Sequence, residues 1–363
     1  MSLLHRKYRI RAPQTGRHLR CGTRALGVST LALALSLGSG QLSAQFICQQ
    51  YGGVVPDAVA SAGALACGSV AEALGAGAVA IGPQSAALGY HANAVGIMAR
   101  AQGDETAAFG ASAYAQGVNG TALGNSAQAQ ASNTTAVGSS ALAQGTNATS
   151  VGAASTAQGN NASAFGRASR ATGEASTAIG TLANAQASAT TALGAAASAS
   201  GTNATATGSD AMAMSNNASA FGQSATATGA GSTALGRGAS ATATNAVAVG
   251  NGARATSAGA VAIGANAVAS GSTAVGDGAQ ATGANTAAYG RGAIAAADNA
   301  TALGEFTQAT AIGATAVGQG AIASHANAAA FGQGVATTRD NQQIFGSSSN
   351  TYTLSGIASA ASR

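Results

Sequence analysis

The sequence lacks most of the side chains from which active sites and ordinary hydrophobic cores are built. Its 363 residues include no tryptophan, 4% aromatic residues and 7% charged residues, whereas charged residues make up about 25% of a typical soluble protein. Only 3 prolines occur, which excludes a collagen-like helix and a proline-rich linker. Glycine is abundant instead, at 52 residues, roughly twice its usual share. This composition argues against an ordinary globular domain.

Positive charge is scarce once the N-terminal segment is set aside. The formal net charge is +5, but seven of the 15 Lys and Arg residues lie before position 25. The rest of the chain is slightly acidic, so it offers no basic patch of the kind that binds nucleic acid. We therefore expect no nucleic-acid partner.

Long hydrophobic runs are also missing, apart from one near the N-terminus. A basic segment is followed there by the apolar run Ala25–Gly38 and then by "SGQLSAQ", which is the order found in secretory signal peptides. We expect residues 1–44 to form a signal peptide that is cleaved after Ala44. The alternative is an N-terminal membrane anchor, although the run is shorter than the about 20 residues that span a bilayer. We expect an exported chain with no transmembrane anchor within it.

Cysteine is rare, with 3 residues in the whole chain. Cys21 lies in the expected signal peptide, which leaves Cys48 and Cys67 in a lead-in segment, residues 45–74. In an oxidising compartment these two cysteines are candidates for one disulfide; the alternative is two separate buried thiols. No CxxC or Cys/His pattern for a metal is present.

The sequence is dominated by one internal repeat, whose marker is a glycine preceded in most units by a large apolar residue. Adjacent marker glycines, called phase glycines below, lie 14 residues apart, except for one interval of 12 before Gly276. The phase glycines are Gly82, Gly96, Gly110, Gly124, Gly138, Gly152, Gly166, Gly180, Gly194, Gly208, Gly222, Gly236, Gly250, Gly264, Gly276, Gly290, Gly304, Gly318, Gly332 and Gly346. Such regularity indicates a repeat architecture.

Each unit contains two short runs in which residue type alternates with period two. Counted from the phase glycine, alanine is almost always at +3 and +5, as in Ala183 and Ala185, and Thr-Ala-apolar precedes the next glycine. This spacing predicts strands, because helical neighbours would be three and four apart and the frequent glycines would weaken a helix. Two strands and two turns per 14 residues predict an all-β solenoid with parallel stacking. At about 4.8 Å per coil, the 19 intervals would form a rod roughly 90 Å long.

Alternation also predicts which side chains point into the coil. We expect the large apolar residues at −1, such as Ile179 and Leu193, to point inward, with the −3 threonines stacked above them and the +3 and +5 alanines on the opposite wall. The −2 alanines, such as Ala178 and Ala192, would then point outward. A continuous outward alanine stripe would let several rolls pack closely, so we expect an oligomer.

One column varies while the rest of the unit is nearly constant. Position +4 lies between the two alanines and is expected to face outward, so it is either a ligand-contacting column or plain solvent-exposed surface. The candidate ligand-facing residues are Arg100, Tyr114, Gln128, Leu142, Arg170, Asn184, Met212, Arg254, Val268, Ile294 and Ile322.

The repeat region offers little for catalysis or metal binding. The two histidines after the signal peptide, His91 and His325, are far apart in turn-like settings, and the acidic residues are scattered. Paired carboxylates, a nucleophile elbow and a phosphate-binding loop are absent from the sequence. We therefore expect no enzymatic activity, no cofactor and no metal.

Units such as "NAVAVGNGARATSAGAVAIGANA", residues 245–267, resemble the head repeats of trimeric autotransporter adhesins, the YadA-like family. The resemblance covers about residues 75–346 and implies a left-handed parallel β-roll, assembly as a homotrimer, and display on the surface of a Gram-negative cell. It also implies adhesion to extracellular matrix, host cells or other surfaces, with autoagglutination or biofilm formation as related activities. Residues 347–363 resemble the segment that leads from such a head toward a stalk.

The sequence departs from this family in ending at Arg363 without heptads, a neck motif or membrane-patterned strands. We therefore expect the stalk and barrel anchor to be absent from this chain, which would be released or held by another protein. Two other classes remain as alternatives: an ice-binding solenoid, which would need outward threonine ladders, and a purely structural surface solenoid. A left-handed β-helix acyltransferase would need a six-residue period and a catalytic histidine.

Overall fold

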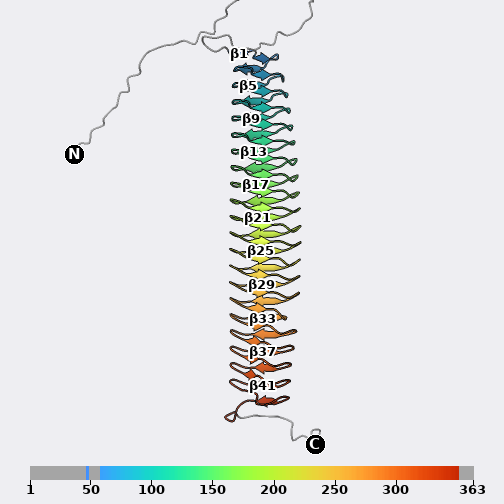
Figure 1. Cartoon of the computed structure of the whole chain (residues 1–363), viewed down its shortest axis with the longest axis vertical. Coiled ribbons are helices and arrows are strands. Elements are labelled where there is room, and N and C mark those ends of the chain that lie inside the picture. The colour runs from blue at the N-terminus through green and yellow to red at the C-terminus, as the bar shows by residue number, and fades with distance from the viewer. Residues whose placement is uncertain (1–45, 49–57, 351–363) are drawn as a thin grey trace, which may run out of the picture. The chain divides into compact units, whose positions relative to one another are not determined.

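The computed structural model describes residues 46–48 and 58–350, and these contain strands and turns but no helix. The strands alternate between three residues and two residues in length, and one of each makes a coil of 14 residues. Figure 1 shows the coils stacked one upon the next from β1 to β42. The predicted all-β solenoid is thus confirmed, while the signal-peptide prediction for residues 1–44 lies outside the described residues.

The three-residue strands form one parallel sheet, called sheet A. Its strands are β1 (Phe46–Cys48), β3 (Leu65–Cys67), β5 (Val79–Ile81), β7 (Asn93–Val95), β9 (Ala107–Phe109), β11 (Thr121–Leu123), β13 (Thr135–Val137), β15 (Thr149–Val151), β17 (Ser163–Phe165), β19 (Thr177–Ile179), β21 (Thr191–Leu193), β23 (Thr205–Thr207), β25 (Ser219–Phe221), β27 (Thr233–Leu235), β29 (Val247–Val249), β31 (Val261–Ile263), β33 (Thr273–Val275), β35 (Ala287–Tyr289), β37 (Thr301–Leu303), β39 (Thr315–Val317), β41 (Ala329–Phe331) and β42 (Gln343–Phe345).

The two-residue strands form a second parallel sheet, sheet B. Its strands are β2 (Val59–Ala60), β4 (Glu72–Ala73), β6 (Ala86–Ala87), β8 (Arg100–Ala101), β10 (Tyr114–Ala115), β12 (Gln128–Ala129), β14 (Leu142–Ala143), β16 (Thr156–Ala157), β18 (Arg170–Ala171), β20 (Asn184–Ala185), β22 (Ser198–Ala199), β24 (Met212–Ala213), β26 (Thr226–Ala227), β28 (Ser240–Ala241), β30 (Arg254–Ala255), β32 (Val268–Ala269), β34 (Gln280–Ala281), β36 (Ile294–Ala295), β38 (Gln308–Ala309) and β40 (Ile322–Ala323).

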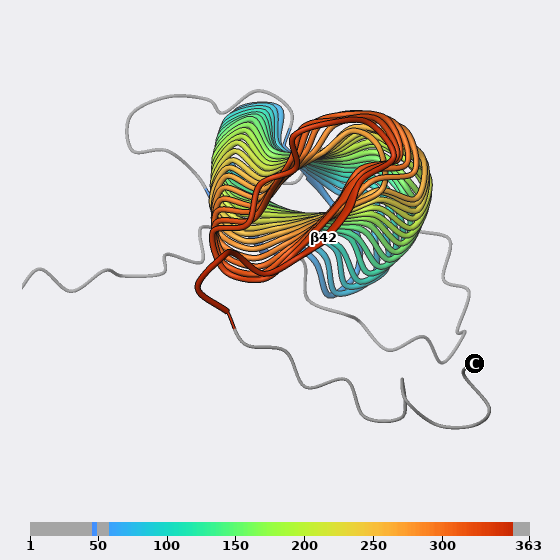
Figure 2. The same cartoon turned by 90° about the horizontal axis from the view of Figure 1, so that it is seen from below.

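Each strand pairs in parallel with its equivalent in the next coil. In sheet A, Thr177 of β19 pairs with Thr191 of β21, and in sheet B, Asn184 of β20 pairs with Ser198 of β22. Equivalent positions of successive coils therefore form continuous columns along the roll. Viewed along the stack, the coils have a common outline and each is turned slightly from the one before (Figure 2).

Two turns close each coil, and both contain residues with positive φ. From Gly68 to Gly332 the phase glycines have φ between +122° and +142°, a region that side chains other than glycine hardly enter. A Cβ added to Gly180 would lie 2.4 Å from the carbonyl oxygen of Gly194 in the next coil. The phase glycine is therefore required both by its backbone angle and by the close approach of the next coil.

The short unit between Gly264 and Gly276 loses its two residues from the second turn. Bends at Ser270 and Ser272 replace the usual turn there, while Val261 still pairs with Thr273 and Val268 with Gln280. The register of both sheets is preserved, which confirms the prediction that a turn absorbs the deletion.

The core of the roll consists of small side chains. In the coil that follows Gly180, the buried positions are +3, +5, +10 and −2, occupied by Ala183, Ala185, Thr190 and Ala192, all 0% exposed. The Thr190 hydroxyl donates a hydrogen bond to the carbonyl oxygen of Ala187 at 2.7 Å. Among the described residues, every buried side-chain polar atom has a hydrogen-bond partner, so these core hydroxyls are buried without an unsatisfied group.

The inward and outward assignment of sheet A was wrong. The −2 alanines, including Ala178 and Ala192, are buried, whereas Ile179 and Leu193 at −1 are 40% and 42% exposed and Thr191 at −3 is half-buried. The reason is that strands of three and two residues make a coil too narrow for a large side chain between its walls. Alanine, serine and threonine fill this space at the close packing of a protein interior. The argument for an oligomer from an outward alanine stripe is therefore withdrawn.

Candidate functional site

The outer surface of sheet A, called face A, is formed by the first and third residues of the three-residue strands. From β3 to β42 it contains no charged residue. The third-residue column consists of Cys67, Ile81, Val95, Phe109, Leu123, Val137, Val151, Phe165, Ile179, Leu193, Thr207, Phe221, Leu235, Val249, Ile263, Val275, Tyr289, Leu303, Val317, Phe331 and Phe345. Face A therefore presents a continuous column of large apolar side chains beside a column rich in threonine.

The outer surface of sheet B, called face B, is formed by the first residue of each two-residue strand and by the residue after the strand. All eleven candidate residues at +4 lie on it, as expected. Arg100, Arg170, Met212 and Arg254 are exposed, and the other seven are half-buried: Tyr114, Gln128, Leu142, Asn184, Val268, Ile294 and Ile322. Because β-strand register aligns them, the structure brings these residues into one column, although nothing yet shows that the column binds a ligand.

The sequence prediction missed the neighbouring column of face B, at position +6. The Tyr114 hydroxyl donates to Oε1 of Gln102 at 2.5 Å, and Gln130 donates to Gln128 at 2.8 Å. Gln144 of the next coil donates to Gln130 at 3.0 Å. The +4 and +6 side chains therefore form one joined surface, and the same period-two alternation that identified +4 could have identified +6.

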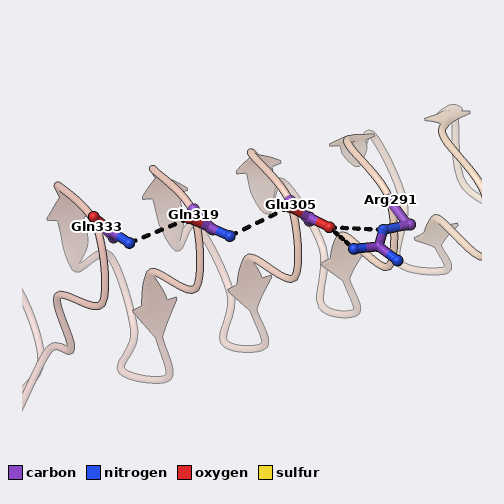
Figure 3. Close-up of polar contacts among 4 residues, drawn as sticks. All are labelled: Arg291, Glu305, Gln319 and Gln333. Atoms are coloured by element: carbon purple, nitrogen blue, oxygen red, sulfur yellow. Dashed lines mark hydrogen bonds and ion pairs between the residues drawn. The ribbon is translucent and has the colours of Figure 1, made fainter.

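Charged side chains lie on face B and at the turns. Glu72, Arg100, Arg170 and Arg254 belong to the +4 column. At the first turn, Arg291 pairs with Glu305 of the next coil, and a hydrogen-bonded column continues through Gln319 and Gln333 (Figure 3). Face B and the edges thus carry the polarity that face A lacks.

Two hollows occur on the described surface. One, of about 340 Å³, lies on face B, where Ala86 is flanked by Glu72, Leu88 and Arg100. The other, of about 750 Å³, lies at the last coil and is lined in part by Phe331, Arg339 and Phe345. Phe331 and Phe345 stack with ring centroids 4.9 Å apart, so the second hollow continues face A.

The described residues hold no cluster of three or more His, Cys, Asp and Glu side chains that could bind a metal. His91 is exposed in a turn with φ +51° and stacks on Tyr90, with ring centroids 3.8 Å apart. Nδ1 of His325 lies 3.0 Å from the hydroxyl of Thr337. Both histidines thus lie at turns, as expected, without a carboxylate partner that would make them a general base.

The two candidate disulfide cysteines are brought into register by the backbone. Strand β1 pairs in parallel with β3, and Cys48 is opposite Cys67 in that pairing. Adjacent strands lie about 4.8 Å apart, within the Cα separations that a disulfide spans. Within the described ranges, no helix is long and apolar enough to cross a membrane.

The repeat can now be compared with known proteins. The model of the YadA head domain repeat matches ten stretches that together cover more than half of the chain: residues 62–85, 73–94, 115–141, 143–169, 171–195, 185–211, 215–239, 241–267, 267–293 and 309–334. The chain belongs to the YadA head family. This membership confirms the resemblance stated from the sequence and makes the roll an adhesin-type surface domain.

Among solved structures, the YadA-like head is similar to the collagen-binding domain of the Yersinia adhesin YadA. The two are 25% identical, and the match covers 51% of this chain and 74% of that chain, with a TM-score of 0.19. A comparison with curated proteins gave no match. Enzymatic activity is not a general property of YadA-like heads.

Proposed function

We propose that the YadA-like head is the adhesive part of a cell-surface homotrimer, in which three chains pack through face A and present face B to a ligand. The observation that carries this proposal is the difference in charge between the two faces. Face A has no charged side chain over its whole length, while face B carries both acidic and basic ones.

Face A is too apolar to remain in contact with water. Leu123, Leu235 and Leu303 are 47%, 48% and 49% exposed, and equivalent side chains recur in every coil. Monomeric proteins seldom expose apolar patches larger than a few hundred Å², and each Å² removed from water contributes about 25 cal/mol. Packing three such columns around a common axis would bury them, and it leaves each face B outward.

Face B supports binding through many weak contacts. Its residues recur at about 4.8 Å along the roll, so a long ligand meets a series of similar side chains rather than one deep pocket. Repeated contacts raise avidity without strong individual interactions. The ligand class that suits this surface is an extended matrix protein or a cell-surface polymer, with autoagglutination as the case in which the ligand is another head.

Export through the expected signal peptide and display on a Gram-negative cell complete the proposal. Both are consistent with membership in the YadA head family and with the low charge of the repeat region. The Cys48–Cys67 disulfide belongs to the same proposal, since an exported chain meets an oxidising compartment.

The mature chain, from residue 45 onward, should be tested for mass in solution by sedimentation and for binding to immobilised matrix proteins, collagen among them. The proposal expects three times the chain mass and saturable binding. A monomer that keeps face A exposed would refute the packing arrangement, while a trimer that binds no matrix protein, cell or second head would refute the adhesive role.

One observation favours a second candidate function. The −3 threonines, such as Thr177 and Thr191, face outward rather than inward, and outward threonine ladders are what an ice-binding solenoid would need. The adjacent −1 column of bulky residues makes face A uneven, which disfavours ice binding. Measuring thermal hysteresis of the purified chain decides the matter, because a freezing-point depression at low protein concentration would establish the ice-binding alternative over the adhesin.

A further inference from the structure

The second turn of many coils carries an asparagine at position +9, in the left-handed backbone region. In seven coils this asparagine begins the triplet Asn-x-Ser/Thr, whose hydroxyl residue is the first residue of the following strand of sheet A. The seven asparagines are Asn119, Asn133, Asn147, Asn161, Asn203, Asn217 and Asn299, all of them exposed and with φ near +57°. Exposed Asn-x-Ser/Thr triplets in exported proteins are acceptors for N-glycosylation.

The repeat makes the triplet common, so the triplet alone does not distinguish these positions. Asparagine is favoured at +9 because it tolerates positive φ, and threonine is common at −3. What separates the seven is the hydrogen bonding of the side-chain amide. That nitrogen, Nδ2, is also the atom that a sugar would be joined to.

Four of the seven asparagines use Nδ2 to bond the next coil. Asn119 donates to Asn133, Asn133 to Asn147, and Asn147 to Asn161, each at 3.1 Å. Asn203 donates to Asn217 at 3.3 Å. A sugar on any of these four nitrogens would occupy the space of the next asparagine, since successive coils are only about 4.8 Å apart.

The other three asparagines are the last members of their ladders. Asn161 and Asn217 accept a hydrogen bond from the preceding coil, as does Asn299 from Asn285 at 3.4 Å, and none of the three amide nitrogens donates one. The next coil has Ala175, Gly231 or Gly313 at the same position. These small residues leave the space beside Nδ2 open, and the exposed turn leads outward from the roll.

We propose that Asn161, Asn217 and Asn299 are N-glycosylation sites of this protein. The sugar comes from a glycosyl phosphate donor, either a sugar nucleotide or a lipid-linked sugar pyrophosphate. A bond forms between Nδ2 and the anomeric carbon, and the bond from that carbon to the donor's phosphate oxygen breaks. The phosphate keeps the electron pair, and the amide gives one proton to a base of the transferase. Transfer precedes folding, since the triplet is fixed in a turn and a strand afterwards.

Mass mapping of peptides from the protein purified from its native exporting cells tests this proposal. Peptides with Asn161, Asn217 and Asn299 are expected to carry added sugar mass. Asn119, Asn133, Asn147 and Asn203 are expected at severalfold lower occupancy. Sugar at none of the seven positions, or equal occupancy at all seven, would overturn the proposal.

Matched variants separate the triplet from the ladder. Ser163→Ala keeps Asn161 and its hydrogen bond from Asn147 but destroys the triplet, so sugar at Asn161 should disappear while Asn217 and Asn299 keep theirs. Gln343→Thr should add a site at Asn341, which ends the ladder from Asn327 but lacks the triplet. Retained sugar at Asn161 in the first variant would contradict triplet-dependent transfer.

A chain without residues 1–44, kept in the cytoplasm of the same cells, distinguishes the two donors. Modification that persists there identifies a sugar-nucleotide donor. Modification found only in the exported chain identifies a lipid-linked donor outside the cytoplasm.

Discussion

Face A and face B are built from the same coils but differ in what their columns allow. On face A, the third-residue column is apolar in nearly every coil, whereas on face B the +4 column changes from Arg100 to Tyr114 to Gln128 within three coils. Backbone pairing is equally regular on both sides, so strand formation does not account for the contrast. Uniform side chains are expected where every coil meets the same packing partner, and varied ones where the surface meets solvent or a ligand.

The largest expected effect comes from placing a charge on face A. Leu193→Asp would put three carboxylates into the interface of the proposed trimer, where an uncompensated buried charge costs about 3–5 kcal/mol. We expect the trimer to dissociate into monomers, measured by sedimentation. Asn184→Asp, on face B of the same coil, is the control and should remain trimeric. Equal behaviour of the two variants would end the distinction between the faces.

Removing the phase glycine should disturb both faces at once. In Gly180→Ala, the added Cβ meets a backbone oxygen at 2.4 Å at φ +129°, so we expect a loss of about 3 kcal/mol or more in the free energy of unfolding. Gly238→Ala is the matched control, because its φ is +63° and no atom lies within 4 Å of the added Cβ. A cost of about 1–2 kcal/mol is expected there. Denaturant unfolding measures both, and similar losses would show that coil contact at Gly180 is unimportant.

The N-terminal coil offers a test that both faces should survive. If Cys48 and Cys67 form a disulfide, Cys67→Ser should destabilise the first coils by about 3 kcal/mol and leave the remaining roll intact, because solenoid coils contact only their neighbours. Thiol titration of the unfolded chain before and after reduction checks the bond directly. Two reactive thiols in the unreduced chain would exclude the disulfide.

Exchanging size between the core and face A tests the corrected orientation of sheet A. Ala192→Leu forces a large side chain into the narrow core and should cost about 1–3 kcal/mol or more. Leu193→Ala removes an outward side chain and should weaken trimer association more than it weakens the coil itself. Circular dichroism during thermal unfolding, at concentrations above and below trimer dissociation, separates the two. The reverse pattern would restore the arrangement expected from the sequence.

The smallest effect is expected at the edge between the faces. Arg291 is 61% exposed and Glu305 is 33% exposed, so Glu305→Gln should change the free energy of unfolding by less than about 1 kcal/mol. Arg291 keeps its position over the Phe306 ring, 4.8 Å from the centroid. Unfolding at low and high salt checks this result, because the small loss should vanish as salt screens the pair. A loss above about 2 kcal/mol would assign the ladder a structural role that exposed pairs seldom have.

Much of the fold could be predicted from the sequence, because the 14-residue beat and the period-two runs are local patterns. They located the strands and turns, and they placed the +3 and +5 alanines inside with +4 outside. The orientation of sheet A was not local. Both Ala192 and Leu193 fit an alternating strand, and only the distance between the two walls of the coil decides which of them is buried.

The sequence by itself therefore determined the repeat, the parallel stacking of coils and the scarcity of groups for catalysis, since all three follow from residue spacing and composition. Only the tertiary structure decided that the core is alanine, that the large apolar side chains face outward, and that some asparagine ladders end beside a small residue. The physical reason is that these features depend on distances between segments, across the coil and between coils. A linear pattern gives the order of side chains but not the space into which each one points.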